Sequence, residues 1–200
     1  MSRTAKATGN FKSVSPGTYV ARCYRIIDIG TQHSEWNGEE KVRNQIVVFW
    51  ELPGETAEFD GVIKPLSVSK FYTNSLHEKA NLRADLKAWR GRDFDETELA
   101  GFDLNNIVGK PCLVTVSAKE NGKTEVASVS PLMKGQECPV QVNTSQTFWL
   151  DEYSDESFNA LSDGMKKLVA KSEEYQAIKS GAPFVYADKA ESTAPDDMPF

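Results

Sequence analysis

The side chains that most often carry catalysis are sparse in this sequence. It contains two histidines, His33 and His77, and neither has a nucleophile or a metal-binding partner at a recognisable spacing. The three cysteines, Cys23, Cys112 and Cys138, lie far apart and form neither a metal-binding pattern nor a disulfide framework. No glycine-rich phosphate loop and no nucleophile elbow occurs. We therefore predict that the chain is not an enzyme and that it binds no metal and no cofactor.

Two further patterns have structural interpretations. Cys23 and Cys112 lie in strand-like apolar segments, which predicts buried, unreactive thiols in a reducing cytoplasm. The acidic pairs between residues 93 and 98 are typical of a helix start, where the helix dipole favours negative charge. Neither pattern indicates catalysis.

Cations and aromatic rings alternate along the strand-like segments of the first 130 residues. Sequence-tolerant binding of single-stranded DNA needs this combination, because cations neutralise phosphates and each base can stack on a ring for about 1–3 kcal/mol. The alternation gives a set of candidate DNA-binding residues: Arg22, Tyr24, Trp36, Lys41, Arg43, Phe49, Lys70, Tyr72, Lys119 and Lys123.

The period of two along a strand predicts which side chains share a face. Between residues 42 and 52 it directs one set inward: Ile46, Val48, Trp50 and Leu52. It leaves a second set on the opposite, DNA-binding face: Arg43, Gln45, Val47, Phe49 and Glu51. By the same argument Lys70 shares a face with Tyr72, and Arg22 shares a face with Tyr24. We expect both pairs to face the DNA.

The formal net charge of −6 argues against a nucleic-acid partner until its distribution is considered. Residues 151–200 contain 11 acidic and 5 basic side chains, whereas residues 1–150 contain 18 of each. The excess negative charge therefore lies in the last quarter of the chain, and the neutral body is able to present a local basic face.

The last five residues, Asp196, Asp197, Met198, Pro199 and Phe200, have the chemistry of a portable ligand. The terminal ring suits an apolar pocket, its own carboxylate suits a neighbouring cation, and the two aspartates steer the tip toward basic surfaces. We predict that this tip binds partner proteins and competes with DNA for the basic groove of the chain itself.

Hydrophobic periodicity gives the elements that must position these residues. We expect strands over residues 18–29, 42–52 and 66–73, helices over 76–90 and 96–100, and strands over 112–118 and 125–131. Ser75 and Glu78 form the pattern of a capping box for the first helix, and Gly91 is its expected stop. Pro53 with Gly54 is expected to end the second strand.

This order of elements matches a mostly β fold, the five-stranded Greek-key OB-fold barrel with a helix between strands 3 and 4. SH3-like barrels and small sandwiches also use about five strands, but they rarely place such a helix there. Residues 147–150 fit an extra strand or a segment packed across the barrel, and 156–173 fit one amphipathic helix. The expected divisions are a flexible arm (1–14), the OB domain (15–150), a helical extension (151–180) and a disordered acidic tail (181–200).

Six stretches resemble a phage-encoded family of single-stranded DNA-binding proteins, over roughly residues 16–135. They are 19–23 (YVARC), 27–32 (IDIGTQ), 69–73 (SKFYT), 75–80 (SLHEKA), 86–92 (LKAWRGR) and 101–104 (GFDL). The last residues resemble the tip of bacterial single-stranded DNA-binding proteins, an acidic run followed by Ile-Pro-Phe. Met198 stands where isoleucine is usual, and the acidic run is shorter.

The resemblance implies an OB fold, coating of single-stranded DNA in phage replication or recombination, and recruitment of replication proteins by the tip. It places the protein in the cytoplasm of an infected bacterium. No apolar run approaches the roughly 20 residues of a membrane span, so no membrane partner is expected. The alternative function is a protein-interaction module whose tail mimics a host recruitment peptide. The oligomeric state stays open.

Overall fold

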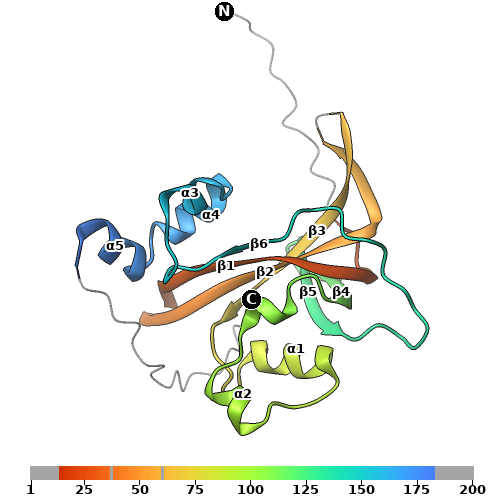
Figure 1. Cartoon of the computed structure of the whole chain (residues 1–200), viewed down its shortest axis with the longest axis horizontal. Coiled ribbons are helices and arrows are strands. Elements are labelled where there is room, and N and C mark those ends of the chain that lie inside the picture. Colours follow the sequence, from red (N-terminus) through yellow and green to blue (C-terminus); the bar gives the residue numbers. More distant parts are fainter. Residues whose placement is uncertain (1–13, 37, 60, 183–200) are drawn as a thin grey trace, which may run out of the picture.

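Six strands form one sheet in the computed structural model of the chain (Figure 1). The structure describes residues 14–36, 38–59 and 61–182. The strands are β1 (Gly17–Trp36), β2 (Glu39–Phe59), β3 (Val62–Thr73), β4 (Pro111–Ala118), β5 (Thr124–Ser130) and β6 (Gln146–Phe148). The helices are α1 (Asn81–Arg90), α2 (Glu96–Ala100), the short 3-10 turn η1 (Leu104–Ile107), α3 (Asp155–Asn159), α4 (Asp163–Val169) and α5 (Glu173–Ser180).

Five of the strands are antiparallel to their neighbours, in the order β3-β2-β1-β4-β5. The short β6 runs parallel to β1, alongside residues 25–27, just beyond the part of β1 that pairs with β4. Within the described residues no ladder joins β3 to β5, so the sheet is open. The chain is therefore mostly β, as expected, and of the two alternatives for residues 147–150, an extra strand or a packed segment, β6 matches the first at residues 146–148. Closure into a five-stranded Greek-key OB barrel stays a prediction.

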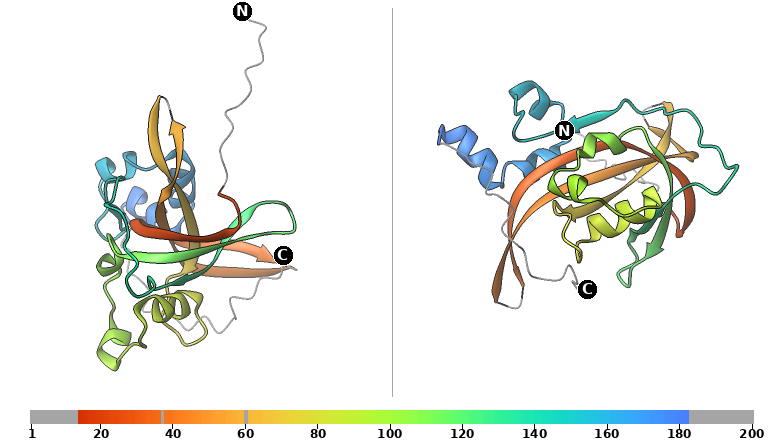
Figure 2. Two further views of the ribbon diagram at one scale, coloured as in Figure 1. Left: turned by 90° about the vertical axis from the view of Figure 1, so that its right-hand side faces the viewer. Right: turned by 60° about the horizontal axis from the view of Figure 1, so that its bottom comes forward.

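The second and third strands continue well beyond the sequence prediction. Pro53 and Gly54 do not end β2, because its ladder with β3 shifts register between Leu52 and Thr56 and then resumes. Residues 56–59 and 62–65 thus form a two-stranded ribbon, which we call the arm. It projects away from the rest of the fold (Figures 1 and 2).

Helices cover both sides of the sheet, with α1 and α2 on one side and α3 to α5 on the other (Figure 1). We call the side toward α1 the inner face and the opposite side the outer face. The apolar stripe Leu82, Leu86 and Trp89 of α1 is buried against the inner face, where it completes the main core. Gly91 ends α1 in the left-handed conformation, as predicted, because glycine adopts a φ of 69° without steric cost.

The start of α1 differs from the expected capping box. The helix begins at Asn81, after Ala80, and no side chain caps it. The Ser75 hydroxyl instead accepts a hydrogen bond from the backbone N–H of His77, in a local turn. Serine side chains satisfy turn N–H groups as readily as helix caps, so the pattern marked the approach to the helix and not its first turn.

The predicted helix over residues 156–173 is three short helices. Ser154 accepts a hydrogen bond from the N–H of Ser157 and starts α3, and Ser172 accepts one from the N–H of Tyr175 and starts α5. Each cap starts a new helix in a new direction. The apolar residues therefore recur at helical spacing although the helix is not continuous. No helix in the described part of the chain is both long and apolar enough to cross a membrane.

A second apolar cluster lies between the outer face and these helices. Ile27, Ile29 and Val47 of the sheet contact Phe148 and residues of α3 to α5 there. The fully buried Glu174 of α5 fixes this packing. Its carboxylate accepts hydrogen bonds from the N–H and hydroxyl of Thr31, at 2.7 and 2.6 Å.

The segment between β5 and β6, residues 131–145, also crosses the outer face, and we call it the strap (Figure 1). The carboxylate of Glu51 on β2 is fully buried beneath it. It accepts hydrogen bonds from the N–H of Val142 at 2.9 Å and from the N–H and side-chain amide of Asn143, both at 2.8 Å. One buried charge therefore holds the strap on the sheet.

Candidate nucleic-acid interface

The alternation along β2 is correct, but both of its faces are largely covered. The inward set Ile46, Val48, Trp50 and Leu52 is fully buried, as predicted. On the outer face Val47 and Glu51 are also fully buried, beneath the C-terminal helices and the strap. The expectation that this face of β2 is open to DNA is therefore wrong at these two positions.

The outer face stays open along β3. The register places Phe71 opposite Val47, Ser69 opposite Phe49 and Ser67 opposite Glu51. Both serines are exposed, and the Phe71 side chain is 50% exposed. An aromatic ring beside two small polar residues leaves room for a flat ligand, such as a base, to lie against the ring.

A cation lies next to this open strip. Arg25 pairs with Phe49 across the β1–β2 ladder, so Arg25, Phe49 and Ser69 form one row on the outer face. The guanidinium carbon lies 5.4 Å from the centre of the Phe49 ring and 5.2 Å from that of Tyr24. No carboxylate pairs with Arg25 within the described residues. No acidic side chain of the described residues therefore neutralises its charge.

The placement of Tyr72 and Lys70 on the DNA-binding face is wrong. The two side chains share a face, as predicted, but it is the inner one, because they pair with the buried Ile46 and Val48. Tyr72 is 3% exposed and donates a hydrogen bond from its hydroxyl to Asp85 of α1 at 2.7 Å. Lys70 forms an ion pair with the same carboxylate at 2.8 Å. The helix therefore seals the tyrosine ring away from any base.

Arg22 and Tyr24 are also engaged within the fold. The Arg22 guanidinium donates to the carbonyl of Gly109 at 2.6 Å and to that of Pro139 at 3.0 Å, so it fastens the strap. The Tyr24 ring is 5% exposed and meets Phe49 edge-on, with ring centres 6.5 Å apart. The predicted exposure of the Tyr24 ring is wrong, and Phe49 itself is only partly exposed.

The β1–β2 hairpin carries three of the predicted residues. Lys41 and Arg43 are partly buried on β2, opposite Ser34 and Gln32 of β1. Trp36 is the last residue of β1, and its side chain lies outside the described part of the structure.

The β4–β5 hairpin holds the other two predicted lysines. The turn has the expected form, since the N–H of Lys119 bonds to the carbonyl of Lys123 and Gly122 has a φ of 76°. Lys119 forms an ion pair with Glu125 at 3.0 Å, whereas Lys123 is exposed. This hairpin lies beside the start of β1, so it marks the opposite end of the sheet from the β1–β2 hairpin.

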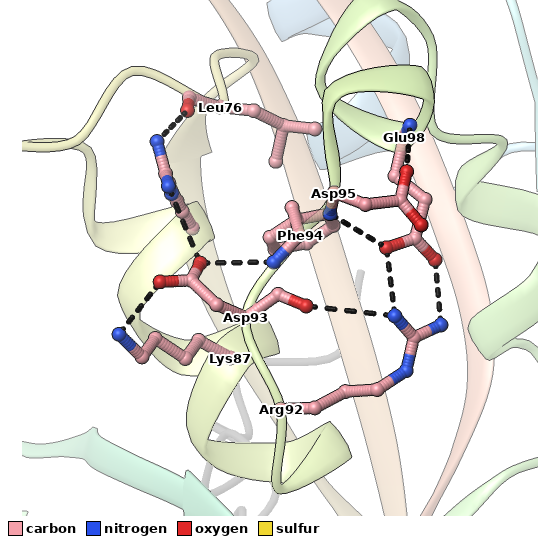
Figure 3. Close-up of polar contacts among 8 residues, drawn as sticks. Leu76, Lys87, Arg92, Asp93, Phe94, Asp95 and Glu98 are labelled. Atoms are coloured by element: carbon pink, nitrogen blue, oxygen red, sulfur yellow. Dashed lines mark hydrogen bonds and ion pairs between the residues drawn. The ribbon is translucent and has the colours of Figure 1, made fainter.

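The cations around the end of α1 are neutralised by acidic residues, which removes them as phosphate sites (Figure 3). Asp93 accepts a hydrogen bond from Lys87 at 2.7 Å. This contact is the main reason that the pKa of the Asp93 carboxyl lies well below the usual range. Glu98 binds Arg92 through both of its oxygens. Asp95 caps α2 by accepting from the N–H of Glu98, so the acidic residues mark a helix start as predicted.

Two features of the described residues concern chemistry other than binding. Cys23 and Cys112 are fully buried, as predicted, and burial raises the pKa of the Cys23 thiol to about 12. Within the described residues no cluster of His, Cys, Asp and Glu is placed to hold a metal ion. The tip residues Asp196, Asp197, Met198, Pro199 and Phe200 lie outside the described residues.

Comparison of the chain with protein-family models, with curated proteins and with solved structures finds no match. The family resemblance therefore stays a prediction. The sequence prediction did not include two residues of the outer face, Phe71 and Arg25. They are next to the predicted residues Tyr72 and Tyr24. The period-two pattern would have found Phe71, had the inner face been identified from the contacts of α1, whereas Arg25 reaches the outer face only through the β-bulge between Cys23 and Arg25.

Proposed function

We propose that this chain binds single-stranded DNA without sequence preference along the outer face of β3. The half-exposed Phe71 carries the proposal, because it gives a stacking surface on an open strand, with Arg25 nearby to neutralise a phosphate. Exposed serines on the same strand leave the backbone of the DNA room to pass.

The arrangement of the sheet supports the same proposal. Three consecutive strands form a meander, α1 follows, and β4 then returns to pair with β1 before the β4–β5 hairpin. We infer an OB-type barrel that is opened between β3 and β5. OB barrels bind single strands across their second and third strands, flanked by the hairpins that join strands 1–2 and 4–5. Lys41, Arg43 and Lys123 lie on those two hairpins. We call these three cations and Arg25 the basic track.

The acidic tip is proposed to act as a competitor and as a recruitment peptide. Its carboxylates would occupy the basic track when DNA is absent, and its terminal ring would bind partner proteins when DNA displaces it. Together with the resemblance, this supports a single-stranded DNA coat in phage replication or recombination, in the cytoplasm of the host.

The test is a titration of fluorescent oligo-dT with the full chain across a salt series, with and without residues 196–200. We expect the logarithm of the affinity to fall linearly with that of salt, by about 0.7 per phosphate neutralised. Deleting the tip should keep or tighten binding. No binding at low salt would refute the proposal and favour the protein-interaction module. Loss of binding on deletion, with the fold intact, would refute only the role of the tip.

A further inference from the structure

The imidazole ring of His33 joins two segments of the fold that lie far apart in the sequence. His33 is near the end of β1, and α5 lies beside this end of the strand (Figure 1). The ring Nδ1 lies 2.7 Å from a carboxylate oxygen of Glu40 on β2, and Nε2 lies 2.5 Å from a carboxylate oxygen of Glu173 on α5. A neutral imidazole has one N–H, whereas the imidazolium has two. Both contacts are hydrogen bonds to carboxylates only when the ring is protonated.

The next residue of α5 completes the same junction in a different way. The buried carboxylate of Glu174 accepts hydrogen bonds from the N–H and hydroxyl of Thr31 and from the side-chain amide of Asn44, the last at 3.1 Å. These donors are neutral groups. The first turn of α5 is therefore held to the β1–β2 hairpin by neutral donors at Glu174 and, at Glu173, by a ring that gains or loses a proton near neutral pH.

The two glutamates determine the charge state of the ring. Their hydrogen bonds outweigh the partial desolvation of His33 and raise its pKa above 6.5. The other charged side chains on this part of β1 and β2 and on the neighbouring α4 are Glu35, Lys41, Arg43, Asp163, Lys166 and Lys167. None of these six forms an ion pair with His33 among the described residues. The side chains of His33, Glu40 and Glu173 are 45%, 69% and 51% exposed, so the ring exchanges its proton directly with water.

We propose that His33 is a pH-sensitive clasp, which holds the first turn of α5 on the β1–β2 hairpin while the ring is protonated and loosens it when the proton passes to water. The neutral ring leaves a lone pair facing one carboxylate, and it no longer places a positive charge between Glu40 and Glu173. Because Tyr175 and Ile178 of α5 pack on the outer-face cluster, the clasp controls how firmly this helix covers the sheet.

This proposal goes beyond DNA binding, and its test uses the full chain without DNA. In a pH series of NMR spectra, the ring signals that disappear in His33→Gln should titrate with a midpoint above 6.5. Backbone amide exchange in α5 is compared between the wild type and His33→Gln at each pH, which cancels the intrinsic pH dependence of exchange. Below pH 6.5 the wild type should exchange more slowly, by about two- to fivefold for exposed ion pairs. The difference should vanish as the pH rises through the His33 midpoint.

Two further variants separate the clasp from a general effect on stability. His77→Gln removes the other histidine of the chain and should keep the pH-dependent protection of α5. Glu173→Gln keeps an acceptor for the ring but removes a charge, so it should lower the His33 midpoint and reduce the protection. A His33 midpoint at or below 6.5 would overturn the proposal, and so would a protection difference in α5 that does not follow the His33 titration. An equal difference in the amides of α1 would indicate global destabilisation and would also overturn it.

Discussion

Phe71 and Tyr72 are neighbours on β3 with opposite environments, and this gives a sharp test of the binding face. Phe71→Ala removes a half-exposed ring from the outer face, whereas Tyr72→Phe removes one buried hydroxyl from the inner face. If DNA lies on the outer face, the first change weakens binding and the second does not. Both variants keep the backbone of the strand.

The expected magnitudes follow from the contacts. Loss of one stacked base costs about 1–3 kcal/mol, which weakens binding by about 5- to 150-fold. Because half of the Phe71 ring is already exposed, its removal should cost only about 1 kcal/mol of unfolding free energy. Tyr72→Phe loses the 2.7 Å hydrogen bond to the Asp85 carboxylate, which is worth about 1.5–3 kcal/mol. The variant with the larger loss of stability should therefore bind DNA normally.

The assay is fluorescence anisotropy of labelled oligo-dT at low salt, paired with urea unfolding of each variant. Phe59→Ala on the arm serves as a control for loss of an exposed ring elsewhere and should bind as the wild type does. If Phe71→Ala binds within twofold of the wild type, the outer face of β3 is not the binding surface. If Tyr72→Phe weakens binding equally, α1 must move on binding and the argument from burial fails.

Three other outcomes follow from contacts within the fold. Glu51→Gln turns an amide donor toward the N–H donors of the strap, so urea unfolding should show a loss of about 2–4 kcal/mol; a loss under 1 kcal/mol would mean that other contacts hold the strap. Gly30→Ala combines a φ of +67° with a Cβ placed 2.5 Å from a Glu174 oxygen, and should cost about 2–5 kcal/mol by the same measurement. Hydrogen bonds to Glu40 and Glu173 raise the pKa of His33 above 6.5. The wild type should be more stable than His33→Gln, and this difference should be fully present below pH 6.5. It should disappear as the pH rises through the raised pKa. A difference in melting temperature that does not change with pH would contradict this.

Local patterns predicted the elements where local physics decides them. The β4–β5 hairpin formed at the predicted turn because Gly122 accepts the left-handed conformation that the turn needs. The short α2 was also predicted with its bounds, since Asp95 and Glu98 satisfy its first N–H groups reciprocally. The end of β2 at Pro53 was wrong, because a ladder to β3 continued beyond a local turn pattern.

The candidate site was only partly predictable for a related reason. Along residues 42–52 and 66–73 the sequence by itself determined which side chains share a face, because the period of two is a property of the extended backbone; the bulges of β1 broke that period. Only the tertiary structure decided which face is covered. Tyr72 is sealed by α1, and Val47 by helices more than one hundred residues later in the chain. Burial arises from segments outside the strand, so a strand's own pattern cannot contain it, and Phe71 rather than Tyr72 is left exposed to solvent.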